Sequence, residues 1–146
     1  MRKATPNDIP TLMAIEIATQ AEPWSEDIFR QCLKIGYDCW LIEENQKIIA
    51  FILVSSTMAG ESHILNLCVD VPYQRRGFGC ELVTYVLKTE KNKGMGVIFL
   101  EVRRTNQPAI ALYQKMGFKQ INVRKNYYPN GKEREDALVL AMDLGE

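Results

Sequence analysis

The sequence predicts an α/β fold in which helices cover both faces of a mixed central β-sheet. Two segments, His63–Val69 and Gly96–Val102, are apolar on both strand faces, which is typical of inner strands covered on each side. A helical pattern follows each of them, and this alternation indicates an α/β architecture. Because 146 residues suffice for one domain with its own core, we expect a single domain over residues 1–146.

The N-terminal quarter predicts a short strand over residues 2–5 and then two helices. Thr5-Pro6-Asn7-Asp8 resembles an N-cap followed by proline. The first helix has its apolar face at Ile9, Leu12, Met13 and Ile17. Pro23-Trp24-Ser25 interrupts this helix, and Ser25 is expected to cap the second, which ends at Gly36. The buried face of the second helix is predicted at Ile28, Phe29, Cys32 and Leu33.

The sequence of the middle of the chain predicts a hairpin, a strand and a long helix. Strands over residues 37–44 and 47–57 are joined by the short polar turn Glu44-Asn45-Gln46. The strand His63–Val69 follows, and Pro72 ends it. The next helix stops near Lys93-Gly94 and has its apolar face at Leu82, Val83, Val86 and Leu87.

The C-terminal third predicts a strand, a helix and a hairpin. After the strand Gly96–Val102, Asn106-Gln107-Pro108 starts a short helix that Gly117 stops. Phe118–Tyr128 and Asp136–Leu144 are expected to pair as strands around the turn Pro129-Asn130-Gly131.

Composition argues against several classes of partner. Lys plus Arg and Asp plus Glu are both 18, so the chain lacks the basic excess of proteins that wrap nucleic acid, and we expect no direct nucleic-acid binding. No apolar run approaches the roughly 20 residues of a membrane helix, so we expect no membrane association. The polar start MRKATPNDIP lacks an apolar signal region, which favours the cytoplasm. We expect a monomer or a weak homodimer.

The four cysteines are expected to be reduced, and no metal site is predicted. They stand at positions 32, 39, 68 and 80 without a Cys-x-x-Cys pair, and His63 is the single histidine that could join them at a metal. A catalytic cysteine would need a nearby base, for which His63 is again the one imidazole. We therefore interpret the cysteines as small buried apolar residues.

A candidate phosphate-binding loop joins the strand His63–Val69 to the long helix. Gln74-Arg75-Arg76-Gly77-Phe78-Gly79 places two guanidinium groups and two glycines at a helix N-terminus. The helix dipole, backbone N–H groups and arginines would converge there on a pyrophosphate. The alternative is a tight strand-to-helix connection with solvated arginines. The loop matches neither the Walker A pattern nor the dinucleotide-binding glycine pattern.

The run Gln74-Arg75-Arg76-Gly77-x-Gly79 resembles the Gln/Arg-x-x-Gly-x-Gly/Ala element of the GCN5-related N-acetyltransferase (GNAT) family. The order of predicted elements from Ile9 to Leu144 also resembles the fold of that family. The resemblance implies a loop that grips the pyrophosphate of acetyl-coenzyme A (acetyl-CoA), with the adjacent strand exposing main-chain groups toward the acetyl carbonyl. The residues implied to bind acetyl-CoA here are Leu67, Cys68, Val69, Gln74, Arg75, Arg76, Gly77, Phe78 and Gly79.

Two further residues are candidates for proton transfer. Glu101 lies among apolar neighbours in a predicted strand, so desolvation is expected to raise its pKa and make it a usable base. Alternatively it stands at an open strand end or pairs with Arg103 or Arg104. Tyr113 shares a helix face with Ile110 and Met116, as a core tyrosine would, but its phenol could also protonate a leaving thiolate.

The segment Leu100-Glu101-Val102-Arg103, with Asn106 and Leu112-Tyr113-x-x-x-Gly117-Phe118, resembles the family's ribosomal-protein-alanine acetyltransferases. In them the glutamate is the general base and the tyrosine the general acid, so the resemblance implies these roles for Glu101 and Tyr113. It also implies that Asn106 and Tyr113 contact the pantetheine arm and thiol of acetyl-CoA. From sequence alone, Asn106 equally predicts a helix cap.

The same enzymes share a Pro-Trp-Ser bend and a Tyr-Tyr pair, which here are Pro23-Trp24-Ser25 and Tyr127-Tyr128. The resemblance implies that Trp24, Tyr127 and Tyr128 wall a slot for the N-terminus of a ribosomal protein, small-subunit protein eighteen. Buried packing is the alternative for all three aromatic residues. Two other functions stay open, an acetyltransferase for a small amine or a lysine side chain and a non-catalytic acyl-CoA-binding module.

Overall fold

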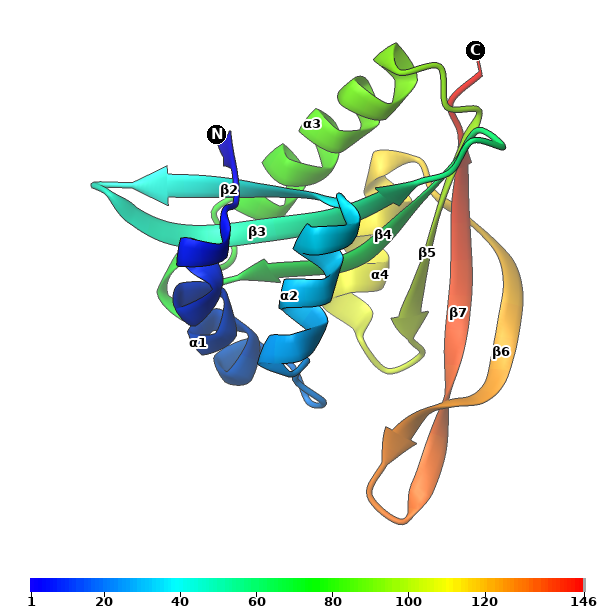
Figure 1. Cartoon of the computed structure of the whole chain (residues 1–146). Coiled ribbons are helices and arrows are strands. Elements are labelled where there is room, and N and C mark those ends of the chain that lie inside the picture. The colour runs from blue at the N-terminus through cyan, green and yellow to red at the C-terminus, as the bar shows by residue number, and fades with distance from the viewer. Residues whose placement is uncertain (146) are drawn as a thin grey trace. The chain divides into compact units, whose positions relative to one another are not determined.

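The computed structural model describes residues 1–145, which divide into two compact units. The first unit comprises Met1–Ser55 and Leu65–Val86, and the second comprises Ser56–Ile64 and the chain from Leu87 onward. Within the described residues, seven strands are hydrogen-bonded in the order β1-β2-β3-β4-β5-β7-β6 (Figure 1). The β4–β5 pair is parallel, whereas the pairs β1–β2, β2–β3, β5–β7 and β6–β7 are antiparallel, so the predicted mixed α/β sheet is confirmed.

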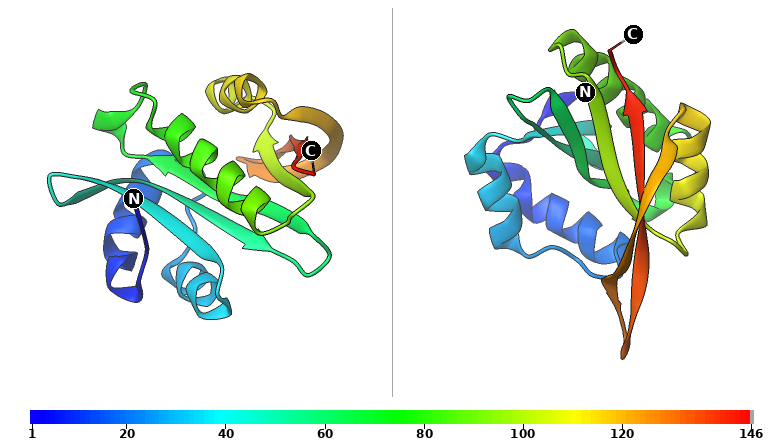
Figure 2. Two further views of the ribbon diagram at one scale, coloured as in Figure 1. Left: turned by 90° about the horizontal axis from the view of Figure 1, so that it is seen from above. Right: turned by 90° about the vertical axis from the view of Figure 1, so that its right-hand side faces the viewer.

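The first unit contains the N-terminal helices and hairpin. Its elements are β1 (Arg2–Lys3), the 3-10 turn Pro6–Asp8, α1 (Ile9–Thr19), α2 (Glu26–Ile35), β2 (Asp38–Glu44), β3 (Lys47–Ser56), most of β4 (Glu61–Val69), the 3-10 turn Val71–Tyr73 and the start of α3 (Phe78–Asn92). Helices α1 and α2 lie side by side in both views (Figures 1 and 2). Asn45 and Gln46 both have positive φ angles, so the predicted β2–β3 hairpin closes through a two-residue turn.

Strand β3 is buried on both of its faces because each face packs against a helix. Phe51 and Leu41 are cross-strand partners, and the Phe51 ring meets Phe29 of α2 with a centroid separation of 5.8 Å. One residue further along, Ile52 pairs with Trp40, whose ring meets Tyr85 of α3 at 4.8 Å. Since neighbouring strand residues point to opposite faces, α2 and α3 cover opposite sides of this hairpin. The prediction of helices on both faces is confirmed here.

Helical periodicity misplaced two residues of the N-terminal helices. Ile17 and Ile28 were predicted to be buried, but they are 63% and 41% exposed. On α1 the buried stripe is Ile9, Leu12, Ile15 and Glu16, so a carboxylate takes a position that the pattern assigned to an apolar residue. Because Glu16 is only 1% exposed, its charge needs partners, and these belong to the candidate site described below.

The second unit contains β5 (Val97–Arg103), α4 (Gln107–Met116), β6 (Lys119–Asn130) and β7 (Glu133–Asp143), together with the start of β4 and the end of α3. Strands β6 and β7 form a long twisted hairpin (Figure 2). Its turn lies at Gly131, where φ is +63°, and β6 continues through Pro129 and Asn130. The predicted turn Pro129-Asn130-Gly131 thus contains the observed turn residue Gly131, but β6 extends two residues further than predicted, through Pro129 and Asn130.

Strand β5 is an inner strand, as predicted, lying between β4 and β7 in the sheet, and it alternates between a buried face and a half-buried face. Ile98, Leu100 and Val102 are buried, whereas Phe99, Glu101 and the other odd-numbered residues are intermediate. The parallel register pairs His63 of β4 with Phe99, which puts His63 on the same face as Glu101. This half-buried face carries the polar residues of the second unit's candidate site.

A buried carboxylate joins α3 to the β3–β4 connection in the second unit. Glu90 is 1% exposed, and its Oε1 atom accepts hydrogen bonds from the hydroxyls of Ser56 at 2.5 Å and Ser62 at 2.7 Å. Its Oε2 atom pairs with Lys93 Nζ at 2.9 Å. Because both oxygens are satisfied, Glu90 is a structural ion-pair residue and a suitable reference for the candidate catalytic carboxylate.

No helix within residues 1–145 combines the length and the apolar character needed to cross a membrane.

Candidate active site

In the first unit, the predicted phosphate-binding loop has a defined backbone conformation and leads directly into α3. Asp70 caps the 3-10 turn Val71–Tyr73 by accepting the Val71 N–H, and its own N–H donates to Ile49 O at 2.8 Å. Arg75 and Gly77 then have φ angles of +64° and +87°. These left-handed residues alternate with ordinary ones just before the helix, which turns successive N–H groups toward one concave side.

The loop has space and positive charge for a phosphate group. A Cβ added to Gly77 would meet no other atom within 4 Å, so the backbone there faces open space. The Arg76 guanidinium lies over the Tyr73 ring at 5.6 Å, and Lys47 Nζ lies over the same ring at 5.8 Å. Tyr73 thus gathers two cations beside a helix N-terminus, an arrangement that fits an anionic group.

The end of β4 is connected to the loop through a side chain. Gln74 Nε2 donates to the carbonyl oxygen of Val69 at 2.9 Å, so part of the Gln74 amide already has a protein partner. Leu67 and Val69 are half-buried, while Cys68 is buried at 2% exposure. Burial, with Glu16 nearby, raises the pKa of the Cys68 thiol to about 12. As a side chain Cys68 is therefore inert, and what it can offer a ligand is its backbone.

Glu16 ties the Pro23-Trp24-Ser25 bend to strand β4. Its Oε2 atom accepts the backbone N–H of Trp24 at 2.9 Å, and its Oε1 atom accepts from Asn66 Nδ2 at 2.7 Å. The Cys68 thiol lies 3.3 Å from Oε1, and Gln20 Nε2 donates to Cys68 Sγ at 3.0 Å. This network fixes the backbone of the bend, and the half-buried Trp24 ring packs against Phe29 at 5.3 Å.

Glu16→Gln is expected to raise the KM for a peptide acceptor about tenfold and to leave kcat within a few-fold, if Trp24 walls the acceptor slot. Both Glu16 oxygens accept hydrogen bonds, from the Trp24 N–H group and from Asn66. A glutamine has only one oxygen, so one of these hydrogen bonds is lost, at a cost of about 1–3 kcal/mol. The measurement is steady-state kinetics with thermal unfolding. Glu90→Gln is the matched control, since it weakens another buried carboxylate and should lower stability without changing KM. An unchanged KM in Glu16→Gln would show that Trp24 does not contribute to binding of the acceptor.

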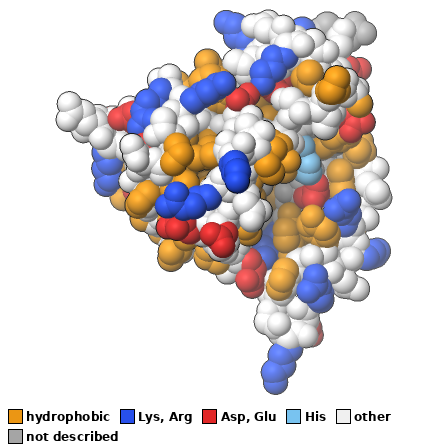
Figure 3. All heavy atoms as spheres, in the orientation of Figure 1, with side chains coloured by type: hydrophobic (Ala, Val, Ile, Leu, Met, Phe, Trp, Pro, Cys, Tyr) orange, Lys and Arg blue, Asp and Glu red, His pale blue; other side chains and the backbone are white. Residues whose placement is uncertain are grey.

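In the second unit, Glu101 is the centre of a charged cluster. Its Oε1 atom lies 2.9 Å from His63 Nε2, and its Oε2 atom lies 3.6 Å from a guanidinium nitrogen of Arg124. The Tyr127 phenol also hydrogen-bonds this carboxylate. The side chain of Glu101 is 14% exposed and that of His63 is 35% exposed. In Figure 3 the histidine, drawn in pale blue, is visible at the surface of the molecule.

The prediction of a raised Glu101 pKa is wrong. The hydrogen bond from His63 is the largest influence and lowers the pKa of Glu101, and it outweighs the opposing effect of burial. Tyr127 and Arg124 lower the pKa further. The carboxylate is therefore ionised throughout the neutral range. The basic side chains that contact Glu101 are His63 and Arg124, whereas Arg103 pairs with Glu135.

A β-bulge brings Tyr127 to Glu101. The β6–β7 register shifts between Arg124 and Tyr128, which leaves extra residues on β6. Asn126 has a φ angle of +54°, and its N–H donates to Asp136 at 3.0 Å. Arg134 donates to the carbonyls of Asn126 and Tyr127, each at 2.9 Å. This bulge re-aims the side chain of Tyr127, which is 40% exposed.

The neighbouring Tyr128 is held by a second set of contacts. Its ring meets that of Tyr127 at 5.0 Å, and the Arg103 guanidinium lies over it at 4.6 Å. Arg103 in turn pairs with Glu135 at 3.2 Å. Burial raises the pKa of Tyr128 to about 12, so its phenol stays protonated. The two predicted aromatic residues are thus brought together with Glu101 in the second unit.

Asn106 caps α4 and Tyr113 lies on it, and the structure shows the helix cap and the core packing that were the alternatives for these two residues. Asn106 is the N-cap, and its Oδ1 atom accepts the Ala109 N–H at 3.3 Å. Tyr113 is 6% exposed, and its ring packs against Phe118 at 5.4 Å. Their contacts with acetyl-CoA stay predictions.

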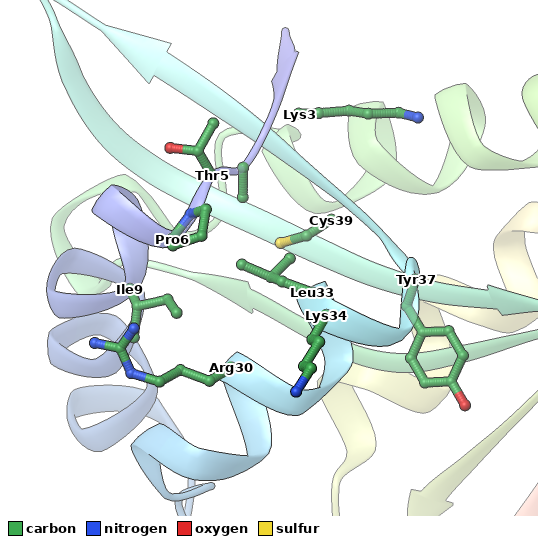
Figure 4. Close-up of a pocket in the computed structure, with 10 residues that line it drawn as sticks. Lys3, Thr5, Pro6, Ile9, Arg30, Leu33, Lys34, Tyr37 and Cys39 are labelled. Atoms are coloured by element: carbon green, nitrogen blue, oxygen red, sulfur yellow. The ribbon is translucent and has the colours of Figure 1, made fainter.

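A separate cavity of about 470 Å³ opens in the first unit between β1, α2 and the start of β2 (Figure 4). Arg30 and Lys34 extend from α2, and Lys3 comes from β1. Two of these cations already have partners, since Lys3 pairs with Asp38 at 3.0 Å and Arg30 with Glu26 at 3.1 Å. The cavity contains none of the predicted site residues.

Sequence reasoning missed Glu16, His63 and Arg124. Glu16 was not predicted to be buried because the apolar face of the first helix was assigned to Ile17, the next residue along the chain. His63 and Arg124 are 38 and 23 positions from Glu101 along the chain, respectively, so no local motif could join them. The signals available for His63 were its place in a mostly apolar strand and its being the single histidine of the chain. Within residues 1–145, no group of three or more His, Cys, Asp or Glu side chains could hold a metal ion.

Comparisons with known proteins agree with these features. The model of the acetyltransferase (GNAT) family matches residues 9–118. The [ribosomal protein bS18]-alanine N-acetyltransferase of Escherichia coli K12 is 35% identical over 137 residues, covering 94% of this chain and 92% of that protein. The protein of the same name from Haemophilus ducreyi is 35% identical and covers 94% of each chain. The crystal structure of the Escherichia coli ribosomal-protein-S18-alanine N-acetyltransferase superposes with a TM-score of 0.93 at 33% identity, covering 99% of this chain and 93% of that one.

Proposed function

Because the chain belongs to the acetyltransferase (GNAT) family and is an N-acetyltransferase, we propose that it acetylates the N-terminal alanine of ribosomal protein bS18, small-subunit protein eighteen. The observation that carries this proposal is 35% identity over 94% of the chain to a protein named for that reaction. The family match spans parts of both units, which supports one catalytic domain over residues 1–146. The proposal extends to a cytoplasmic protein that acts as a monomer or weak homodimer.

The loop Gln74–Gly79 is proposed to hold the pyrophosphate of acetyl-CoA. The support is the open space at Gly77 and the two cations over Tyr73. When bound, acetyl-CoA supplies the acetyl group as an activated thioester. Backbone groups of Leu67, Cys68 and Val69 would orient the acetyl carbonyl, and Asn106 would orient the pantetheine arm. These roles rest on the family's motif.

Glu101 and Tyr113 are proposed to handle protons, and Trp24, Tyr127 and Tyr128 to wall the acceptor slot. An ionised Glu101 attracts a peptide's α-ammonium group and serves as general base when the amine attacks. The Tyr127 contact supports a place for the acceptor beside Glu101. Tyr113 would donate its phenolic proton to the leaving thiolate, since a phenol has an ordinary pKa near 10.

The test of this function is a panel of short peptides that differ at the first residue, incubated with acetyl-CoA and the full chain. We expect mass spectrometry to place one acetyl group on the α-amine, with the bS18 N-terminal sequence preferred. A lysine-containing peptide with a blocked N-terminus and a free small amine serve as matched alternatives. Acetylation of either alternative at a higher rate would overturn the proposed acceptor class.

Tyr113→Phe is expected to lower kcat about 10–100-fold, with little change in affinity for acetyl-CoA. The ring that packs against Phe118 is retained, and only the hydroxyl is removed. The measurement is kcat under single-turnover conditions together with a direct titration of acetyl-CoA binding. Tyr85→Phe is the control, because Tyr85 packs against Trp40 in the other unit. Equal kcat values in wild type and Tyr113→Phe would assign Tyr113 to the core alone.

A further inference from the structure

Glu101 has a partner whose chemistry the proposed function leaves unused. The contact between His63 Nε2 and Glu101 Oε1 measures 2.9 Å, and a carboxylate can only accept a hydrogen bond. The proton of this bond therefore belongs to Nε2. In the neutral imidazole the other nitrogen, Nδ1, is then an acceptor with a lone pair. A carboxylate that fixes the tautomer in this way makes histidine a positioned base.

We infer that His63 is a further catalytic residue that shares the role of general base with Glu101: the proton of the neutral acceptor amine ends on the imidazole, whose Nε2–H group Glu101 holds. This inference rests on the proposed function and deepens it, because it names the group that keeps the proton. In sequence terms the histidine comes from β4 and the carboxylate from β5, adjacent parallel strands whose register puts both on one face.

Electrostatics favour histidine over Glu101 as the final acceptor. An α-amine has an ordinary pKa of about 7.7–8.0. The pKa of Glu101 lies below the ordinary range of a carboxyl, so a proton on this carboxylate is held much more weakly than on the amine. Protonated imidazole, by contrast, would still donate from Nε2 to Glu101 and would gain an opposite charge beside it.

The surrounding charges are compatible with an imidazole that gains a proton. From β6, Arg124 and Tyr127 approach the pair through Glu101. Glu61 lies two residues before His63 and on the same face of β4. Arg103 lies two residues after Glu101 and on the same face of β5. Of these groups, Glu101 contacts the imidazole, Arg124 contacts Glu101, and Arg103 pairs with Glu135. The His63 side chain is 35% exposed, so water or an amine can reach it.

The reaction balances with this assignment. The amine nitrogen forms a bond to the acetyl carbon, and the bond from that carbon to sulfur breaks. One proton passes from the amine to His63 Nδ1, directly or through one water molecule. The leaving thiolate takes one proton from Tyr113. The imidazolium and the phenolate then exchange with solvent, which restores both residues for the next turnover.

The experiment compares His63→Gln with the wild-type chain in kcat/KM for the accepted peptide, from pH 5.5 to 9.5. Glutamine retains an N–H donor for Glu101 and lacks a titratable nitrogen. We expect a loss of about 10–100-fold at pH 7. We also expect the acidic limb of the profile to change its position on the pH axis, because the variant lacks the titratable imidazole. Acetyl-CoA affinity and thermal stability should change little.

Two results would overturn the inference. One is wild-type kcat/KM in His63→Gln at pH 7 with chemistry limiting. The other is a uniformly reduced profile with the wild-type acidic limb, which would make His63 only a support for Glu101. Failure of the proposed function is distinguishable from both, because the wild-type chain itself would then acetylate no peptide N-terminus, and the same profile would be measured with whichever amine it accepts.

Discussion

Glu101→Gln is expected to lower kcat/KM for a peptide acceptor by about 10²–10⁴-fold at pH 7, the usual contribution of a positioned base. Glutamine keeps the shape and can still accept from His63 Nε2, but it removes the negative charge between His63 and Arg124. Raising the pH should partly restore activity, since an α-amine with a pKa of about 7.7–8.0 then reacts already neutral. Lysine, with a pKa near 10.4, would show this rescue only at much higher pH.

The control for this variant is Glu90→Gln, which removes another ion-paired carboxylate of the same unit and should leave kcat/KM unchanged.

The pH dependence of stability gives a second check on Glu101. Because the folded state lowers the pKa of Glu101, the stabilisation by its charge is present above the ordinary glutamate pKa of about 4.3. It is lost as the pH falls through the lowered value, so the stability difference between wild type and Glu101→Gln should shrink in acid. Full activity of Glu101→Gln at pH 6.5 would exclude Glu101 from proton transfer.

Gly77→Val is expected to weaken acetyl-CoA binding about 10–100-fold, the equivalent of losing one or two hydrogen bonds to charged groups. The added side chain would occupy the open space at Gly77, on the side where phosphate oxygens are proposed to approach. Calorimetric titration of acetyl-CoA measures this loss directly.

Gly36→Val is the matched control for backbone strain. Gly36 also has a positive φ angle, +101°, and a Cβ there would also meet no atom within 4 Å. Both variants place a branched residue in the left-handed region, at a cost of about 1–2 kcal/mol in stability. The control should therefore match the loss of stability and keep normal affinity. Equal affinities for acetyl-CoA in the two variants would remove Gly77 from the phosphate site.

Local patterns in the sequence were sufficient for most of the fold. The helix and strand types followed from periodicity, and the Ser25 cap and the left-handed glycines 36 and 117 ended helices as expected. The errors have physical causes. Ile17 was assigned to the core because apolar spacing cannot show which side of a helix meets a sheet. The end of β6 was predicted two residues too early because the strand tolerates Pro129 near the hairpin end, where the loss of one N–H group matters little.

The candidate site was only partly predictable, because a charge's behaviour depends on neighbours from distant segments. Apolar residues beside Glu101 in the chain suggested desolvation, and that effect is present. The decisive partner, His63, comes from the adjacent strand, and Arg124 and Tyr127 come from a bulged strand further along. Side-chain pairing across strands is set by register, which a single sequence does not encode locally.

The buried thiols of Cys39 and Cys68 can be used to measure how often the first unit opens. Burial raises the pKa of Cys39 and Cys68 to about 12, so neither forms the thiolate that reacts with an alkylating reagent at neutral pH. Cys39 lies under α1 and α2, and Cys68 lies beneath the Glu16 network. Their alkylation therefore requires these helices to separate from the strands, and the rate of labelling measures how often the native first unit opens.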